Sequence, residues 1–166
     1  MSRALDPSRP GARVVSRGRT VTEADVAQFA ALTGDMHPQH TDAVWAAGSR
    51  FGERVAHGML VLSYCVGLVE FDAERVVALR RVANAVFKRP VALGDTIHVE
   101  SAVESVDRLD GDHSLVACDW RVLNQDGRLV ARATVELVWR GQVATASEPS
   151  AAVAPPLDED FVPIPL

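Results

Sequence analysis

One segment near the middle of the chain, residues 59–69, constrains the fold more than any other. Its sequence, MLVLSYCVGLV, leaves almost no polar face when it is wound as a helix. A helix that is apolar all round must be buried, because each of its sides would otherwise expose hydrophobic surface to water. The segment is also too short to cross a bilayer, which takes about 20 apolar residues. We therefore predict a central helix enclosed by the rest of the fold.

The sequence after this helix changes to patterns typical of strands. Asp110-Gly111 and Asp126-Gly127 are hairpin signals, because Gly accepts the positive φ that tight turns need. The expected strands cover residues 76–87, 96–103, 114–123 and 129–139. The order of these elements, with helices first, then one buried helix and then a run of strands, is typical of an α+β protein. We predict an antiparallel β-sheet wrapped around a long central helix.

The N-terminal part predicts shorter elements. Residues 13–21 suit an edge strand, and Thr22 can cap a helix that Gly34 ends. Residues 35–41 are expected to be a loop, and residues 42–48 a second short helix. At 166 residues the chain suits one domain, over residues 13–140. Residues 1–12 are expected to be irregular, and the Pro/Ala-rich residues 141–166 to be a tail that is disordered or draped over a neighbour.

Charge and cysteine content exclude several classes of protein. The net charge is −5, from 17 Lys+Arg against 22 Asp+Glu, whereas nucleic-acid-binding proteins are usually basic. A local basic patch for a phosphorylated ligand stays open. Cys65 and Cys118 lie far apart without metal-ligand spacing, which favours buried free thiols in a reducing cytosol. We expect a cytoplasmic protein with no secretory signal, no nucleic acid and no membrane among its partners.

The segment TGDMHPQHTD, residues 33–42, concentrates ionisable groups around a proline. Asp35 and His40 flank a turn that Pro38 stiffens. A carboxylate and an imidazole held close together can bind one water and move its protons, since histidine titrates near neutrality. A helix-capping turn without catalytic function would have the same composition, so both interpretations remain open at this point.

The segment FGERVAHGML, residues 51–60, places Gly58 where the central helix begins. Unpaired N–H groups at a helix start can hold an oxyanion, and glycine lets a ligand approach the backbone closely. Tight packing of the helix start under the sheet explains the glycine equally well. His57, the preceding residue, suits either a pocket wall or an orienting position at the helix start.

Together the two segments resemble the MaoC-like dehydratases and (R)-specific enoyl-CoA hydratases. The family pattern runs F-x-x-L-T-G-D-x-N-P-x-H-x-D and then F-G-x-x-I-A-H-G-M-L. The matching positions here are Phe29, Leu32, Thr33, Gly34, Asp35, Pro38, His40, Asp42, Phe51, Gly52, Val55, Ala56, His57, Gly58, Met59 and Leu60. Residues 87–96, FKRPVALGDT, also resemble a strand-turn-strand of the family, so the match spans most of residues 13–140.

The resemblance implies a hotdog fold and an enzyme that hydrates 2-enoyl thioesters or dehydrates 3-hydroxyacyl thioesters. It implies that Asp35 and His40 activate water, and that the Gly58 backbone amide polarises the thioester carbonyl. It requires no metal and no other cofactor. The implied substrate is an acyl thioester of coenzyme A or of an acyl carrier protein. The implied assembly is a homodimer, or an assembly of dimers, with the active site close to the subunit boundary.

Two departures from the family pattern bear on the site. The asparagine that usually precedes the proline is His37 here, which suits either the same structural hydrogen bonding or an effect on the neighbouring pair. Some family members also carry a serine near the aspartate, further along the central helix. Ser63 and Val66 are the nearby positions, and the pattern assigns the serine to neither.

Two other functions fit the same sequence. A hotdog thioesterase would share the fold, although the Asp35 and His40 spacing followed by His57-Gly58 favours the hydratase. A non-catalytic acyl-binding subunit is the alternative of a different class, suggested by His37 and by the unassigned serine.

Overall fold

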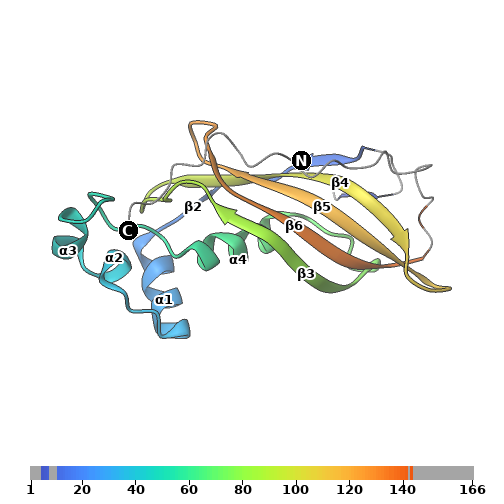
Figure 1. Cartoon of the computed structure of the whole chain (residues 1–166), viewed down its shortest axis with the longest axis horizontal. Coiled ribbons are helices and arrows are strands. Elements are labelled where there is room, and N and C mark those ends of the chain that lie inside the picture. Colours follow the sequence, from blue (N-terminus) through green and yellow to red (C-terminus); the bar gives the residue numbers. More distant parts are fainter. Residues whose placement is uncertain (1–4, 8–10, 142, 144–166) are drawn as a thin grey trace.

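The chain folds as one antiparallel sheet with a helix against one of its faces (Figure 1). The computed structural model describes residues 5–7, 11–141 and 143. The helices are α1 (Glu23–Thr33), α2 (Pro38–Thr41), α3 (Ala43–Ala47) and α4 (Gly58–Leu68). The strands are β1 (Arg13–Val15), β2 (Arg19–Thr20), β3 (Val76–Phe87), β4 (Thr96–Arg108), β5 (His113–Leu123) and β6 (Leu129–Arg140). Helices α1 to α3 gather at one end of the sheet, as Figure 1 shows.

The sheet has the strand order β1-β4-β5-β6-β3, and β2 pairs with β4 beside this path. Every pairing is antiparallel, which confirms the α+β class predicted from the sequence. The two Asp-Gly pairs lie in the turns on either side of β5, and Gly127 takes a φ of 71°, as a tight turn requires. Strand β3 pairs with β6 alone among the described strands, so β3 forms one edge of the sheet.

Helix α4 is the predicted central helix. Its inner side is formed by five buried residues, which are Leu60, Val61, Leu62, Cys65 and Leu68. The prediction that the helix is buried all round is wrong for its other side, where Met59 is 61% exposed and Val66 41% exposed. The physical reason is that the sheet of a single chain covers one side of α4 and leaves a stripe at helical spacing open (Figure 1).

The elements before α4 follow the predicted start and stop signals, with two corrections. Thr22 and Asp25 form a capping box at the start of α1, and Gly34 ends the helix with a φ of 79°. The expected loop of residues 35–41 contains the short helix α2, because Pro38 is preset for a first helical position. The expected edge strand is split into β1 and β2, since the Ser16 hydroxyl accepts the Val99 N–H in place of a strand carbonyl.

The core lies between α4 and the sheet and is built mainly from valine, leucine and tryptophan. Trp120 and Trp139 are buried, as expected of apolar anchors. Cys65 and Cys118 are buried free thiols, as predicted, and burial raises the pKa of each to about 12. Neither cysteine is therefore suited to act as a nucleophile.

The described parts of the two terminal segments reach the core. Leu5 is buried, and its N–H donates to the Glu70 carbonyl. The described residues before Arg13 contain no helix or strand. Most of the expected tail, residues 141–166, lies outside the described residues. Of those that are described, Val143 is buried and donates its N–H to the Ser114 hydroxyl.

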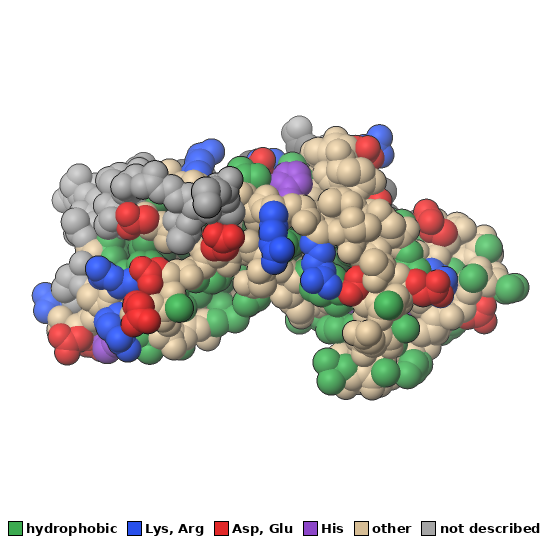
Figure 2. Space-filling model, turned by 180° about the vertical axis from the view of Figure 1, so that it is seen from behind, with side chains coloured by type: hydrophobic (Ala, Val, Ile, Leu, Met, Phe, Trp, Pro, Cys, Tyr) green, Lys and Arg blue, Asp and Glu red, His purple; other side chains and the backbone are tan. Residues whose placement is uncertain are grey.

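The surface carries both signs of charge. On the face in Figure 2, acidic and basic side chains lie interspersed, with hydrophobic side chains between them. At the edge, a buried carboxylate on β6, Glu136, pairs with Arg80 and Arg81 of β3 and ties the edge strand to its neighbour. Within the described residues, no helix is long and apolar enough to cross a membrane.

Candidate active site

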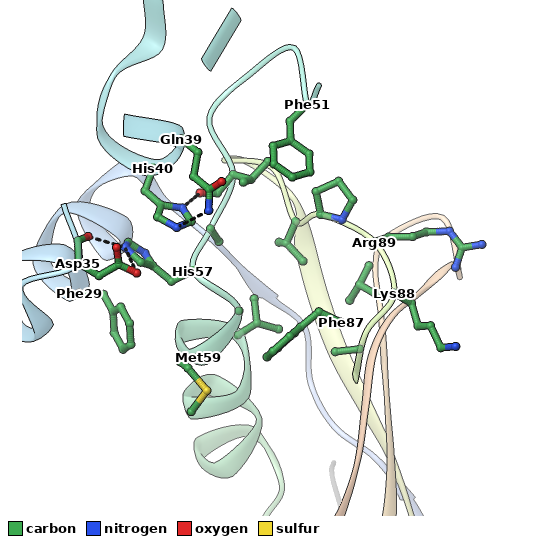
Figure 3. Close-up of a pocket in the computed structure, with 18 of the residues that line it drawn as sticks. Phe29, Asp35, Gln39, His40, Phe51, His57, Met59, Phe87, Lys88 and Arg89 are labelled. Carbon is green, nitrogen blue, oxygen red and sulfur yellow. Dashed lines mark hydrogen bonds and ion pairs between the residues drawn. The ribbon is translucent and has the colours of Figure 1, made fainter. Parts of the chain in front are cut away.

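A cavity of about 620 Å³ opens beside the first turn of α4. One side of it is formed by residues of α1, α2 and the loops that follow them, and the other by the end of β3 and the start of β6. Its walls are largely apolar, with Phe29, Phe51 and Phe87 among them (Figure 3). Five polar residues of the two sequence motifs line it, namely Thr33, Asp35, Gln39, His40 and His57. The cavity therefore brings together segments that are far apart in the sequence.

Asp35 lies in the turn that Gly34 opens at the end of α1. Its Oδ1 accepts the His37 N–H at 3.3 Å, which fixes the side chain over the following turn. The side chain is 53% exposed in the single chain, so one carboxylate oxygen remains accessible from the cavity. The carboxylate is thus both oriented by its own loop and open to a ligand.

His40 is buried, and the hydrogen bonds of its ring determine its tautomer. Its Nδ1 lies 2.6 Å from the Val55 carbonyl oxygen, which can only accept a hydrogen bond. Nδ1 therefore carries the proton, and Nε2 of the neutral ring is an acceptor, to which the Gln39 side-chain amide donates at 3.0 Å. This tautomer leaves Nε2 ready to accept a proton.

Opposing effects set the basicity of His40. Burial lowers its pKa most strongly, because a charged imidazolium is disfavoured away from water. The hydrogen bond to Val55 and the charge of Asp35 raise the pKa, whereas the neighbouring His57 and His37 lower it. The net result is a pKa below the ordinary value of histidine, so the neutral form persists to lower pH.

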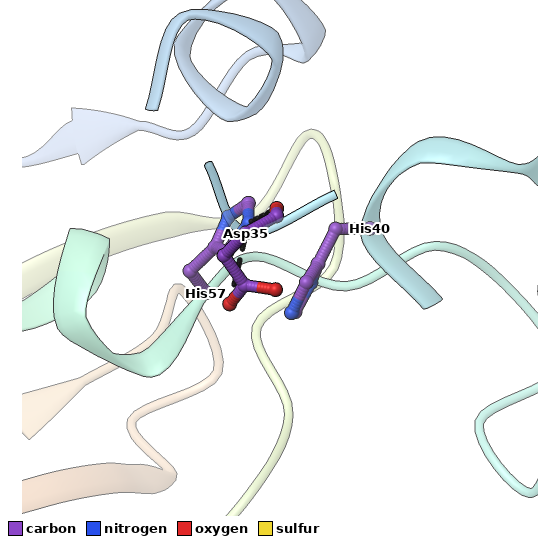
Figure 4. Close-up of side chains that lie close together, drawn as sticks. All are labelled: Asp35, His40 and His57. Carbon is purple, nitrogen blue, oxygen red and sulfur yellow. Dashed lines mark hydrogen bonds and ion pairs between the residues drawn. The ribbon is translucent and has the colours of Figure 1, made fainter. Parts of the chain in front are cut away.

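Asp35, His40 and His57 come together in space (Figure 4). One nitrogen or oxygen atom from each lies within 4.8 Å of those of the other two. A gap of this size between a carboxylate and an imidazole suits one bridging water. The same three side chains have the composition of a metal site, but the rings of His40 and His57 stack 3.7 Å apart at 26°. The in-plane lone pairs of stacked rings run side by side, so they do not converge on one metal ion as tetrahedral coordination demands.

Gly58 begins α4 at the wall of the cavity. His57 is the N-cap residue and provides no side-chain hydrogen bond to the first turn, so the amides there are left for another acceptor. A Cβ at Gly58 would lie 2.8 Å from the Phe87 ring, which explains sterically why glycine occupies this position. Gly58 is thus tightly packed at the helix start and also lines the cavity, and its oxyanion role stays a prediction.

The remaining residues considered in the sequence are less central. His37 caps α2 by accepting the Gln39 N–H at its Nδ1, and its ring meets Trp45 edge-on. Ser63 donates its hydroxyl to the Met59 carbonyl, and neither Ser63 nor Val66 lines the cavity. In the single chain, therefore, no serine of α4 reaches Asp35.

Some site residues were missed by the sequence analysis. The Gln39 side chain is hydrogen-bonded to the His40 ring, although the side chains of adjacent residues on a helix normally point in different directions. Sequence spacing therefore gives no signal for this contact. Arg50, Lys88 and Arg89 line the cavity as well, and the only available signal was the Lys-Arg pair before Pro90.

A family model described as "MaoC like domain" matches residues 7–122. The chain belongs to this family. Among its relatives, Protein MaoC of Klebsiella aerogenes is 44% identical over 92 residues, which cover 55% of this chain and 28% of that protein. The (R)-specific enoyl-CoA hydratase of Aeromonas caviae is 33% identical over 106 residues, which cover 64% of this chain and 77% of that enzyme. This chain therefore spans about a quarter of the Klebsiella MaoC and most of the Aeromonas enzyme.

A solved structure supports the same assignment. An Archaeoglobus protein described as a monoamine oxidase regulatory protein superposes with a TM-score of 0.76 at 36% identity, over 80% of this chain and 90% of that one. Like its structural relatives, this chain has the hotdog fold, in which an antiparallel sheet curls around one helix. The fold that the sequence resemblance implied is thus confirmed.

The environment of His40 predicts its titration. We expect the Cε1–H signal of His40 to titrate with a midpoint below about 6.5, the ordinary value for histidine. At a pH between the lowered pKa of His40 in the folded chain and its ordinary pKa in the unfolded chain, the unfolded chain binds more protons than the folded one. In this window the contribution of His40 therefore makes the free energy of unfolding rise with pH. Above about pH 6.5 its contribution is constant. Nuclear magnetic resonance titration checks the midpoint, and His40→Gln identifies the signal. A midpoint at or above 6.5 would contradict burial as the dominant influence on this ring.

Proposed function

We propose that this protein catalyses the reversible hydration of 2-enoyl thioesters and the dehydration of 3-hydroxyacyl thioesters. The observation that carries the proposal is the convergence of three groups on one cavity. The Asp35 carboxylate, the His40 ring with its unprotonated Nε2 and the backbone start of α4 at Gly58 all line it. The first two suit a bound water, and the third suits the oxygen of a thioester carbonyl.

In hydration, the water lies between Asp35 and His40. The carboxylate accepts a hydrogen bond from the water and orients it, while His40 Nε2 takes its other proton. The resulting hydroxide adds to C3 of the enoyl group, and the electron pair of the double bond moves toward the thioester carbonyl. The Gly58 N–H stabilises the enolate-like oxygen that forms. Return of the proton from His40 to C2 completes the addition of one water, and dehydration follows the same steps in reverse.

The names of the relatives agree with this chemistry. The Aeromonas relative is named an (R)-specific enoyl-CoA hydratase, and a relative from Methylorubrum extorquens a 3-hydroxybutyryl-CoA dehydratase. A hotdog thioesterase would instead release a free thiol. A crotonyl thioester assay separates the two, because hydration removes enoyl absorbance without releasing thiol. Binding without turnover would indicate a non-catalytic acyl-binding subunit.

The cavity also offers a site for the carrier of the acyl group. Arg50, Lys88 and Arg89 line it, whereas Asp35 is the one carboxylate among the described residues that do so. Lys88 and Arg89 extend on the opposite side of the pocket from Asp35 and His40 (Figure 3). This local excess of cations in a chain of net charge −5 suits a phosphate on the pantetheine arm, which coenzyme A and carrier proteins both have.

A homodimer is the assembly we propose, or a larger assembly built from dimers. Strand β3 is an edge strand, and Val77, Leu79 and Val82 on it are each more than 40% exposed. Pairing of this edge with a second copy would cover unpaired backbone groups and apolar side chains together. The cavity lies at the end of β3, which agrees with an active site near the subunit boundary. Light scattering at micromolar concentration is expected to give twice the chain mass or a multiple of it, and a monomer would contradict the proposal.

Removing either member of the catalytic pair is expected to abolish most of the activity. Asp35→Asn keeps the shape of the side chain but removes its charge, and His40→Ala removes the acid–base group. His40→Ala should lower turnover of a crotonyl thioester by about 100-fold or more, the lower range for a general acid–base group. Asp35→Asn should lower it by a similar factor, because the reacting water loses its orientation. The double variant should be hardly slower than the slower single variant, because one water depends on both groups. Steady-state kinetics of hydration measures all three.

His37→Asn is the matched control for these variants. It introduces the residue usual in the family, and an asparagine side chain can cap α2 as His37 does. Its activity is expected to stay close to that of the wild type. Wild-type rates in Asp35→Asn and His40→Ala would place the site elsewhere, and a collapse in His37→Asn alone would make His37 the acid–base group.

The cationic side of the cavity predicts a specific loss of affinity. Lys88→Gln with Arg89→Gln should raise KM for crotonyl-CoA by about 5- to 10-fold, from roughly 0.6 kcal/mol for each of the two exposed ion pairs that are lost. Values of kcat, and KM for crotonyl-pantetheine, which lacks the phosphate, should not change. Arg128→Gln, outside the cavity, is the control. Equal changes in KM for both thioesters would contradict a phosphate site. A crotonyl carrier protein, assayed in parallel, shows for which carrier the double variant raises KM more.

A further inference from the structure

His57 contacts the other two polar side chains of the site. Its ring is 3% exposed and stacks on the ring of His40, with the centroids 3.7 Å apart. Its Nε2 lies 3.0 Å from the main-chain oxygen of Asp35 and 3.9 Å from Oδ2 of the same residue. Because a carbonyl oxygen only accepts, Nε2 carries the proton and donates it to the Asp35 main chain. Phe29 packs against the same ring at 5.1 Å between centroids.

The second nitrogen of His57 is costly for the fold. With Nε2 protonated, Nδ1 of the neutral ring is an acceptor, and it is buried without a partner among the described protein groups. A buried acceptor that lacks a hydrogen bond destabilises the native state, whereas a phenylalanine would fill the same space without an unpaired nitrogen. Packing alone therefore does not account for histidine at this position.

We propose that His57 is a positioning residue for the reaction, an inference that rests on the hydratase function proposed above. Its N–H holds the main chain of Asp35 against the start of α4, and the face of its ring sets the plane of the His40 imidazole. The same residue directly precedes Gly58, whose amide binds the thioester oxygen in the proposed mechanism. His57 thereby keeps carboxylate, imidazole and amide in one arrangement and itself transfers no proton.

Positioning and packing lead to different results when His57 is replaced. If His57 only packs the helix start, its replacement should lower stability, with activity falling as the fold loosens. If it positions the site, stability should change little, because losing the bond to the Asp35 main chain and removing the unpaired Nδ1 have opposite effects on it. Turnover should nevertheless fall, because the reacting groups lose their alignment. The melting temperature and kcat thus separate the two explanations.

A pH profile provides a second, independent test. The charged and titratable groups that act on His40 are Asp35 of the preceding turn, His37 at the start of α2 and His57 at the start of α4. Asp35 raises the pKa of His40, and both histidines lower it. Removing the His57 imidazole is therefore expected to move the acidic limb of kcat/KM to higher pH. A residue that only fills space would leave the limb in place.

Two substitutions divide the contacts of His57 between them. His57→Phe keeps a flat buried ring for His40 and loses the donor to Asp35, whereas His57→Gln keeps an N–H donor and loses the ring. His57→Phe should lower kcat for a crotonyl thioester by about 10- to 100-fold, with a smaller change in KM and little change in melting temperature. His57→Gln should keep part of the rate that His57→Phe loses. His98→Gln, on β4 away from the cavity, is the matched control and should behave as the wild type.

The possible outcomes either support or overturn the proposal. Wild-type kcat in His57→Phe would overturn it, and so would a melting temperature that falls together with kcat in both variants. If the wild type hydrates no enoyl thioester, the proposed function fails, but positioning can still be tested without turnover. In that case His57→Gln, which lacks the stacking ring, is expected to give a broadened or doubled Cε1–H signal of His40 by nuclear magnetic resonance, because the His40 ring is no longer fixed. A single sharp signal as in the wild type would overturn positioning.

Discussion

Burial of α4 against the sheet is the constraint on which the rest of the structure depends. An apolar helix of this kind is stable only when one face is covered, and the five core residues of α4 meet this condition. The first amides of any helix, however, have no partner within the helix. The fold places them at the wall of a cavity, where Gly58 is close to Phe87 and open to a ligand. The interaction that stabilises the core therefore also creates a place that attracts negative charge.

The polar side of the site is assembled by main-chain carbonyls rather than by salt bridges. His40 donates to Val55 across 15 residues, and His57 donates to Asp35 across 22. Each carbonyl fixes one ring nitrogen as a donor, and this determines which nitrogen remains an acceptor. Two neutral imidazoles can then stack closely, which two imidazolium ions could not do without strong repulsion. The tautomers, the stacking and the lowered pKa of His40 are thus parts of the same arrangement.

Local signals in the sequence predicted what local forces determine. The capping box at Thr22, the end of α1 at Gly34 and both Asp-Gly turns depend on nearby residues, and each was found where it was expected. The pairing of Asp35 with His40 followed from a motif in which the two residues are close in the chain. The contact of His57 with Asp35 and the exposed stripe of Met59 and Val66 depend on tertiary packing, which periodicity does not report.

The two groups of the proposed catalytic pair occupy different environments, and this difference suits their different tasks. His40 is buried, so its neutral form is favoured and Nε2 can accept a proton near neutral pH. Asp35 remains half in water on a turn that holds one of its oxygens, which suits a group that orients a water molecule without having to exchange the proton itself. Exchange of the two environments would leave the carboxylate desolvated and the imidazole readily charged, and neither state would activate water. In the proposed mechanism, the buried imidazole therefore takes the proton and the exposed carboxylate holds the water.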